Sequence, residues 1–242
     1  MKSCFRYLIQ LSCCIVALET IAGAQVPPYS GSAFIDADII TPDDPTSFVS
    51  AEYVGTGKRL VFDRRVNRWL NIDMQLFEAT FSDGFSTEVR VNPEFERPTA
   101  MAEVTKYASA IGRLPRVLRS DVASVTIHKG VEPFGGGNEN ILIHTGQGER
   151  YGDFLEEILV HEATHTSLDA AHATADAWLA AQEADGNFIS TYARDFPIRE
   201  DVAESFLPWL AVRHRSTRLN QVDQDKINQS IGNRLRYFDQ LS

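Results

Sequence analysis

The segment His161-Glu162-Ala163-Thr164-His165 restricts the possible folds of this chain more than any other feature of its sequence. On an α-helix, positions i and i+4 share a face, so both imidazoles can reach one ion while the glutamate lies beside it. Zinc suits two imidazoles plus a carboxylate and leaves one position for a water, whose proton the glutamate can accept. The spacing therefore predicts a helix that holds Zn²⁺ through His161 and His165, with Glu162 as the general base.

The residues before this segment favour a helix that begins close to it. Gly152-Asp153 precedes an apolar run, and Asp153 with Glu156 is typical of a capping box. We expect the helix to begin there and to continue to about Leu168. The alternative interpretation is a surface helix with two unrelated histidines.

A catalytic zinc site also requires a third protein ligand. A metzincin would have Gly at 168 and His at 171, but this chain has Leu168 and Ala171, which disfavours that family. The remaining downstream candidates carry a carboxylate or an imidazole and are Asp169, His172, Asp185, Glu200, Asp201 and Glu204.

Among these candidates, Glu200 and Glu204 fit best because they form an i, i+4 pair on one helix face. Such a pair can supply one ligand and one carboxylate that supports a ligating histidine from behind. Asp169, one turn after His165, is better placed to orient that histidine than to bind metal.

The order of HExxH, then Tyr192-Ala193, then Glu200-Asp201-Val202-Ala203-Glu204-Ser205-Phe206 resembles the gluzincin metallopeptidases. It is most similar to the group of anthrax lethal factor and the bacterial Pro-Pro endopeptidases. The resemblance spans about residues 141–206. It implies that Glu200 is the third zinc ligand, that Glu204 supports His161 or His165, and that Tyr192 donates to the developing oxyanion.

The resemblance also implies how an extended peptide would bind. In that family the strand before the HExxH helix forms the rim along which the substrate pairs, and Ile141 to His144 would take that role here. For Tyr192 the alternative is a packing aromatic whose hydroxyl reaches solvent.

The rest of the chain predicts an α+β fold. Residues 25–98 are rich in β-branched and aromatic residues, which indicates several short strands. Turn signals interrupt this region at Pro42-Asp43-Asp44-Pro45, Gly55-Thr56-Gly57 and Ser82-Asp83-Gly84. Residues 99–242 are expected to form a zincin-like unit, in which a small sheet packs on the HExxH helix and the Glu200 helix closes the site. Gly135-Gly136-Gly137 matches no phosphate-binding pattern and is expected to be a flexible loop. Helices are expected at about residues 98–111, 170–184, 199–214 and 223–241.

Residues 1–24 have the features of a signal peptide. Lys2 and Arg6 precede an apolar run, and Ala22-Gly23-Ala24 offers a cleavage site before Gln25. We therefore expect a secreted or periplasmic protein with no stable membrane span. The three cysteines all lie in the leader, so the mature chain would contain none. The net charge of −10 disfavours binding to nucleic acid.

Together these features predict an extracellular zinc metallopeptidase that hydrolyses peptide bonds in an extended peptide or protein. Three alternatives remain open at this point. The chain could be a secreted zinc amidohydrolase with a non-peptide substrate, a zinc-binding adhesive module without turnover, or a metal-free structural domain.

Overall fold

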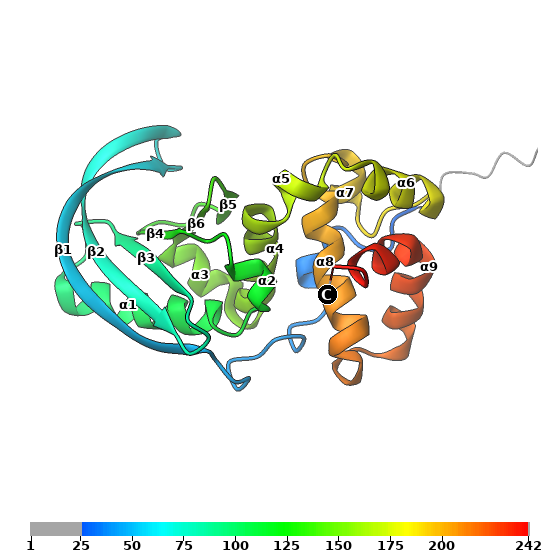
Figure 1. The fold of residues 1–242 in the computed structure, drawn as a ribbon, viewed down its shortest axis with the longest axis horizontal. Coiled ribbons are helices and arrows are strands. Elements are labelled where there is room, and N and C mark those ends of the chain that lie inside the picture. Colours follow the sequence, from blue (N-terminus) through cyan, green and yellow to red (C-terminus); the bar gives the residue numbers. More distant parts are fainter. Residues whose placement is uncertain (1–25, 242) are drawn as a thin grey trace, which may run out of the picture.

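A six-stranded mixed sheet forms one side of the molecule, and a group of helices forms the other (Figure 1). The computed structural model describes residues 26–241, so the expected signal peptide at residues 1–24 lies outside the described residues. The sheet has the strand order β1-β2-β3-β4-β6-β5. Its strands are β1 (Phe48–Asp63), β2 (Arg68–Phe81), β3 (Ser86–Val91), β4 (Ser124–His128), β5 (Gly135–Gly137) and β6 (Asn140–His144). The expected α+β class is confirmed.

Strands β1 and β2 form one long curved hairpin rather than several short strands. The expected turn at Gly55-Thr56-Gly57 is wrong: β1 continues through it with a register shift, and Gly55 absorbs the irregularity at φ +124°. A bulge of this kind bends a strand without ending it. The turn expected at Ser82-Asp83-Gly84 is present and joins β2 to β3.

The centre of the sheet is parallel, with β4 between β3 and β6. β6 pairs with β4 along its whole length, and the antiparallel β5 covers its other side from Asn140 to Leu142. The expectation that Ile141–His144 forms the free rim is therefore wrong for Ile141 and Leu142. The expectation of a flexible loop at the three glycines is also wrong, because they form β5 at the edge of the sheet. Glycines carry no side-chain pattern from which a strand could be predicted.

One face of the sheet packs on helices α1 and α4. The helices are α1 (Arg97–Ile111), α2 (Arg116–Arg119), α3 (Thr145–Tyr151), α4 (Leu155–Ser167), α5 (Asp169–His172), α6 (Asp176–Asp185), α7 (Thr191–Asp195), α8 (Asp201–His214) and α9 (Gln221–Phe238), with 3-10 turns η1 (Ser32–Phe34), η2 (Gly152–Phe154) and η3 (Ser216–Arg218). The expected helices therefore exist, except that residues 170–184 divide into α5 and α6. Ala175 is extended between them, and this turns α6 so that Trp178 packs 5.2 Å from the ring of Phe238.

The capping box expected at the start of α4 is wrong. The helix begins after η2, and Asp153 makes no capping hydrogen bond. Glu156 is buried and pairs with Arg113 at 3.1 Å. The Glu156 carboxylate, which the sequence assigned to a capping box, therefore makes a tertiary contact instead.

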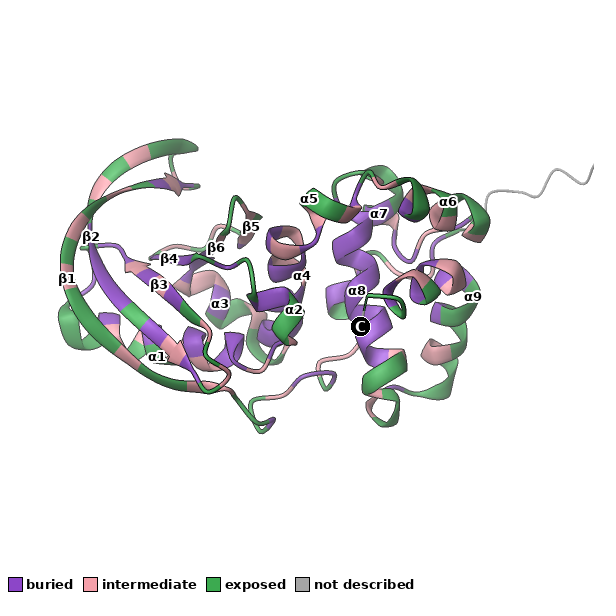
Figure 2. Cartoon of the chain, viewed as in Figure 1, coloured by how far each residue is buried: buried purple, intermediate pink, exposed green. Residues whose placement is uncertain are grey.

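The most completely buried helix is α8, whose residues 201–211 are all buried (Figure 2). It lies between α4 on one side and α9 on the other. Helices α4 and α8 therefore face each other where the sheet-bearing and helical sides of the molecule meet. Within residues 26–241, no helix is long and apolar enough to cross a membrane.

Candidate metal centre

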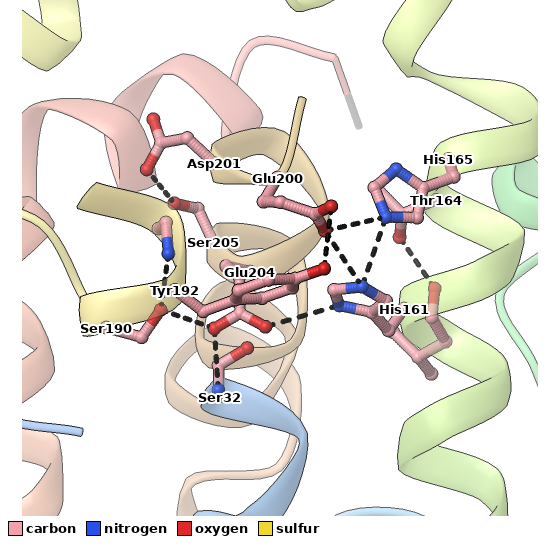
Figure 3. A network of polar contacts seen from close by, with 12 residues as sticks. Ser32, His161, Thr164, His165, Ser190, Tyr192, Glu200, Asp201, Glu204 and Ser205 are labelled. Carbon is pink, nitrogen blue, oxygen red and sulfur yellow. Dashed lines mark hydrogen bonds and ion pairs between the residues drawn. The ribbon is translucent and has the colours of Figure 1, made fainter. Parts of the chain in front are cut away.

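Helices α4 and α8 enclose a cleft of about 1020 Å³. Its lining comes from η1, β5, α4, α7 and the start of α8. His161 and His165 project into it from α4, and Glu200 and Glu204 project from the opposite side (Figure 3). The two halves of the motif, 35 residues apart in sequence, are thus brought together.

Three ligand atoms converge at this point. His165 Nε2 lies 3.1 Å from His161 Nε2 and 3.1 Å from Glu200 Oε2, and His161 Nε2 lies 3.4 Å from Glu200 Oε2. Tetrahedral zinc with bonds of about 2.0–2.1 Å would space its ligand atoms about 3.3 Å apart. Within the described residues, His161, His165 and Glu200 are the group that could hold a metal ion.

The outer nitrogen of His165 is held by Asp169. His165 Nδ1 lies 2.6 Å from Asp169 Oδ2, within one turn of helix. A carboxylate at this distance fixes the proton on Nδ1 and leaves the Nε2 lone pair directed into the cleft. Asp169 therefore orients the histidine, as its spacing predicted, and is not among the converging atoms.

The outer nitrogen of His161 faces Glu204. His161 Nδ1 lies 3.4 Å from Glu204 Oε1, an ion-pair distance. The other oxygen of this buried carboxylate accepts hydrogen bonds from the Ser32 backbone N–H at 2.7 Å and from the Ser190 hydroxyl at 2.5 Å (Figure 3). These two donors fix the carboxylate, so Glu204 orients His161 from across the cleft.

Glu200 shares its charge among several partners. Its Oε2 faces the histidines, whereas its Oε1 accepts hydrogen bonds from the Tyr192 hydroxyl at 2.9 Å and from Arg199 Nε at 2.6 Å. The residue lies at the N-cap position of α8, close to the positive end of the helix. Tyr192 is partly exposed in the cleft and, in this structure, contacts the Glu200 carboxylate.

The local charges favour a cation between these groups. Burial lowers the pKa of His165, but hydrogen bonds to Asp169 and Glu200 outweigh it and raise this pKa to about 10. Burial also lowers the pKa of His161, but the hydrogen bond to Glu200 outweighs it, so this pKa is raised as well. Burial would raise the pKa of Glu200, yet the two histidines hold it well below its usual range. An arrangement that attracts protons this strongly also suits a divalent cation, and the donor set of two imidazoles and a carboxylate is the one zinc prefers.

Glu162 lines the same cleft beside the two histidines. Strand β5 closes over its backbone: a Cβ on Gly136 would lie 1.9 Å from the Glu162 carbonyl oxygen. The Gly137 N–H donates to Thr166 Oγ1 at 2.9 Å, which fastens β5 to α4. The three glycines therefore allow a sheet edge to lie directly against α4, the helix that carries His161 and His165.

The other candidate ligands have different partners. His172 Nδ1 contacts the Tyr237 hydroxyl at 2.6 Å, and Asp185 pairs with Arg234 at 2.9 Å. Asp201 is fully buried on the far side of α8, where it pairs with Arg234 and accepts from Gln182 at 2.9 Å. Adjacent positions on a helix point about 100° apart, which separates Asp201 from Glu200.

Sequence reasoning did not identify Ser32, Ser190 or Arg199 as part of this site. Ser190 carries a local signal, because its hydroxyl also caps α7 by accepting from the Ala193 N–H at 3.0 Å. The Ser32 contact uses a backbone N–H from 172 residues away, which no residue type encodes.

No family model, curated protein or solved structure matches this chain. The resemblance to gluzincins therefore depends on the motif residues alone.

Proposed function

We propose that this protein is a secreted zinc metallopeptidase. The observation that carries the proposal is the convergence of His161 Nε2, His165 Nε2 and Glu200 Oε2 at spacings of 3.1–3.4 Å in an open cleft. Two histidines with a purely structural role are not expected to meet a carboxylate oxygen at one point that solvent can reach.

The proposed roles follow from the positions of the side chains. His161, His165 and Glu200 would hold the ion, while Asp169 and Glu204 keep the imidazoles oriented. Zinc at such a site acidifies a bound water and polarises a carbonyl. Glu162 would accept the proton of the attacking water and pass it to the leaving amine. Tyr192, whose hydroxyl already reaches the Glu200 carboxylate, would stabilise negative charge on the carbonyl oxygen.

Peptides are the proposed substrates because a strand edge borders the cleft. β5 is the last strand of the sheet, and its glycines line the cleft without side chains that would obstruct a partner. An extended peptide can hydrogen-bond to such an edge, whereas a small amide would make little use of it. β5 thus takes the place that the sequence assigned to Ile141–His144.

Metal analysis and peptide cleavage on the same preparation test this proposal. The purified mature protein should contain about one zinc per chain and should cleave peptides in a proteome-derived pool, with chelation abolishing cleavage and zinc restoring it. Zinc with no cleavage of any peptide would favour the binding module or a non-peptide substrate. Absence of zinc would favour a structural domain.

A further inference from the structure

The tip of the β1–β2 hairpin places an arginine where two cavities meet. Arg64 lines the metal-bearing cleft and also a second cavity of about 420 Å³. Gly135–Gly137 and Asn138 are shared by the same two cavities, so Arg64 lies over β5 at their junction. The second cavity includes Phe62 and Trp69, whose rings pair at 5.6 Å.

The hairpin tip is fixed, so the position of Arg64 is defined. The neighbouring Arg65 donates to the buried Asp63 through Nε and Nη2 at 2.9 and 2.8 Å, and to Glu94 at 2.8 Å. It also reaches the Lys129 carbonyl at 3.2 Å, which ties the tip to the loop after β4. The Arg65 side chain is therefore held by hydrogen bonds within the protein, whereas the Arg64 side chain is exposed.

Arg64 itself has no ion pair or side-chain hydrogen bond to any residue between 26 and 241. Of the described residues lining the metal-bearing cleft, Arg64 and Arg199 have permanently cationic side chains, and Arg199 already pairs with Glu200. The other charged lining groups include Glu162, Asp169 and Asp195, which would repel an anion. Arg64 is thus the place in this cleft where a substrate anion could be accepted.

The Arg64 guanidinium borders the cleft from one face of β5. A Cβ on Gly135 would lie 2.7 Å from Arg64 Nη2, so the arginine lies over the bare backbone of β5. Gly136, the next residue, faces the Glu162 backbone, so Arg64 lies on the opposite face of β5 while it borders both cavities.

We propose that Arg64 determines specificity by binding a carboxylate of the peptide substrate. This inference rests on the proposed function. The guanidinium presents a planar set of donors that matches a carboxylate with two parallel hydrogen bonds. The carboxylate can belong to an Asp or Glu side chain or to the C-terminus of the peptide. In either case the carboxylate should lie at a roughly constant distance from the scissile bond, because the backbone that carries Arg64 is held by the contacts of Arg65.

Two pairs of peptides separate the sources of the carboxylate. A cleaved peptide is compared with its C-terminal amide, and separately with variants in which each Asp or Glu becomes Asn or Gln. Loss of the recognised carboxylate should lower kcat/KM about 10- to 100-fold in the wild-type protein. The same change should have little effect in Arg64→Gln, and Arg64→Glu should disfavour the acidic peptide. Equal loss in wild type and Arg64→Gln, or no loss in either, would overturn the inference while leaving the metallopeptidase intact.

Arg68→Gln is the matched control, since this exposed arginine lies on the same hairpin and lines neither cavity. It should behave as wild type. Gly135→Ala gives an independent arm, because the added methyl displaces the guanidinium without removing its charge. It should weaken the carboxylate preference as Arg64→Gln does.

Binding measured without turnover keeps the test valid if no cleavage is found. Zinc-loaded Glu162→Gln protein is equilibrated with a randomised hexapeptide pool in free-acid and amidated forms, and the bound peptides are identified by mass spectrometry. Enrichment of free-acid peptides, or of peptides that contain Asp or Glu, should disappear when Arg64→Gln is combined with Glu162→Gln in one chain. It should persist when Arg68→Gln is combined with Glu162→Gln. No enrichment in the parent protein would refute a carboxylate site at Arg64 even if the protein has no peptidase activity.

Discussion

The molecule contains two pairs of neighbouring histidines with opposite surroundings. His161 and His165 on α4 have ring centroids 4.7 Å apart and are faced by Asp169, Glu200 and Glu204. His128 and His144, at the ends of β4 and β6, stack with centroids 5.7 Å apart, and no carboxylate of residues 26–241 forms an ion pair with either ring. Burial lowers the pKa of both strand-end histidines, whereas carboxylates raise the pKa of both α4 histidines. The carboxylates, rather than the proximity of two imidazoles, distinguish the candidate metal site from the packed pair.

Removing the Glu200 carboxylate, which faces His161 and His165, should have the largest effect on zinc binding. Glu200→Ala leaves two protein ligands, so we expect zinc affinity to fall by well over 100-fold and activity to be lost. Zinc content after dialysis measures this. His144→Asn, at the second pair, should retain the full complement at neutral pH. A Glu200→Ala protein that keeps its zinc while Asp169→Asn or Glu204→Ala loses it would move the third ligand.

Changing the glutamate between the α4 histidines should separate chemistry from binding. Glu162→Gln preserves shape and removes basicity, so we expect hydrolysis to slow by about 10²–10⁴-fold with zinc still bound. Steady-state kinetics and metal analysis on one sample measure both quantities. Near-normal turnover would assign the proton transfer to another group.

The two orienting carboxylates should differ from each other. Glu204→Gln and Asp169→Asn are each expected to weaken zinc binding about 10- to 100-fold without emptying the site. The larger effect should be at Glu204, which is fully buried and fixed by two donors, whereas the Asp169 side chain is 24% exposed. Titration with a competing chelator gives the two affinities, and a larger loss at Asp169 would reverse the ranking.

The second histidine pair should affect stability rather than metal. Burial first, and then the neighbouring His128, lower the pKa of His144 to about 4, compared with about 6.5 in an unfolded chain. The neutral ring is favoured in the folded state, so this contribution is complete above about pH 6.5 and is lost as the pH falls toward 4. It amounts to at most about 3 kcal/mol.

Denaturant unfolding between pH 7 and pH 4 measures this contribution. His144→Asn should flatten the fall in the free energy of unfolding over that range, whatever its stability at pH 7. An unchanged slope in His144→Asn would show that other groups cause the acid sensitivity.

The parts of the site that could be predicted from sequence are those made within one helix. The spacing of His161 and His165, and of Asp169 one turn later, fixes their geometry without knowledge of the fold. Ser32 and Arg199 could not be predicted, because their roles arise from where distant segments dock. Strand β5 was missed since glycines have no hydrophobic alternation, and the length of β1 was missed because a glycine bulge looks like a turn.

The hydrogen bond from the Ser32 backbone to Glu204 has a consequence for the order of assembly. It joins the beginning of the described chain to one of its last helices, across 172 residues, and the Tyr29 carbonyl beside it accepts from the Thr191 N–H at 2.9 Å. Contacts of such long sequence separation form late, because a large loop must close first. While α4 can present its histidines early in folding, the carboxylate behind His161 takes its place only after residues 29–34 have docked on α7 and α8. While the chain is still being synthesised, the candidate metal centre would therefore be incomplete, and the proposed activity would appear only with the final native contacts.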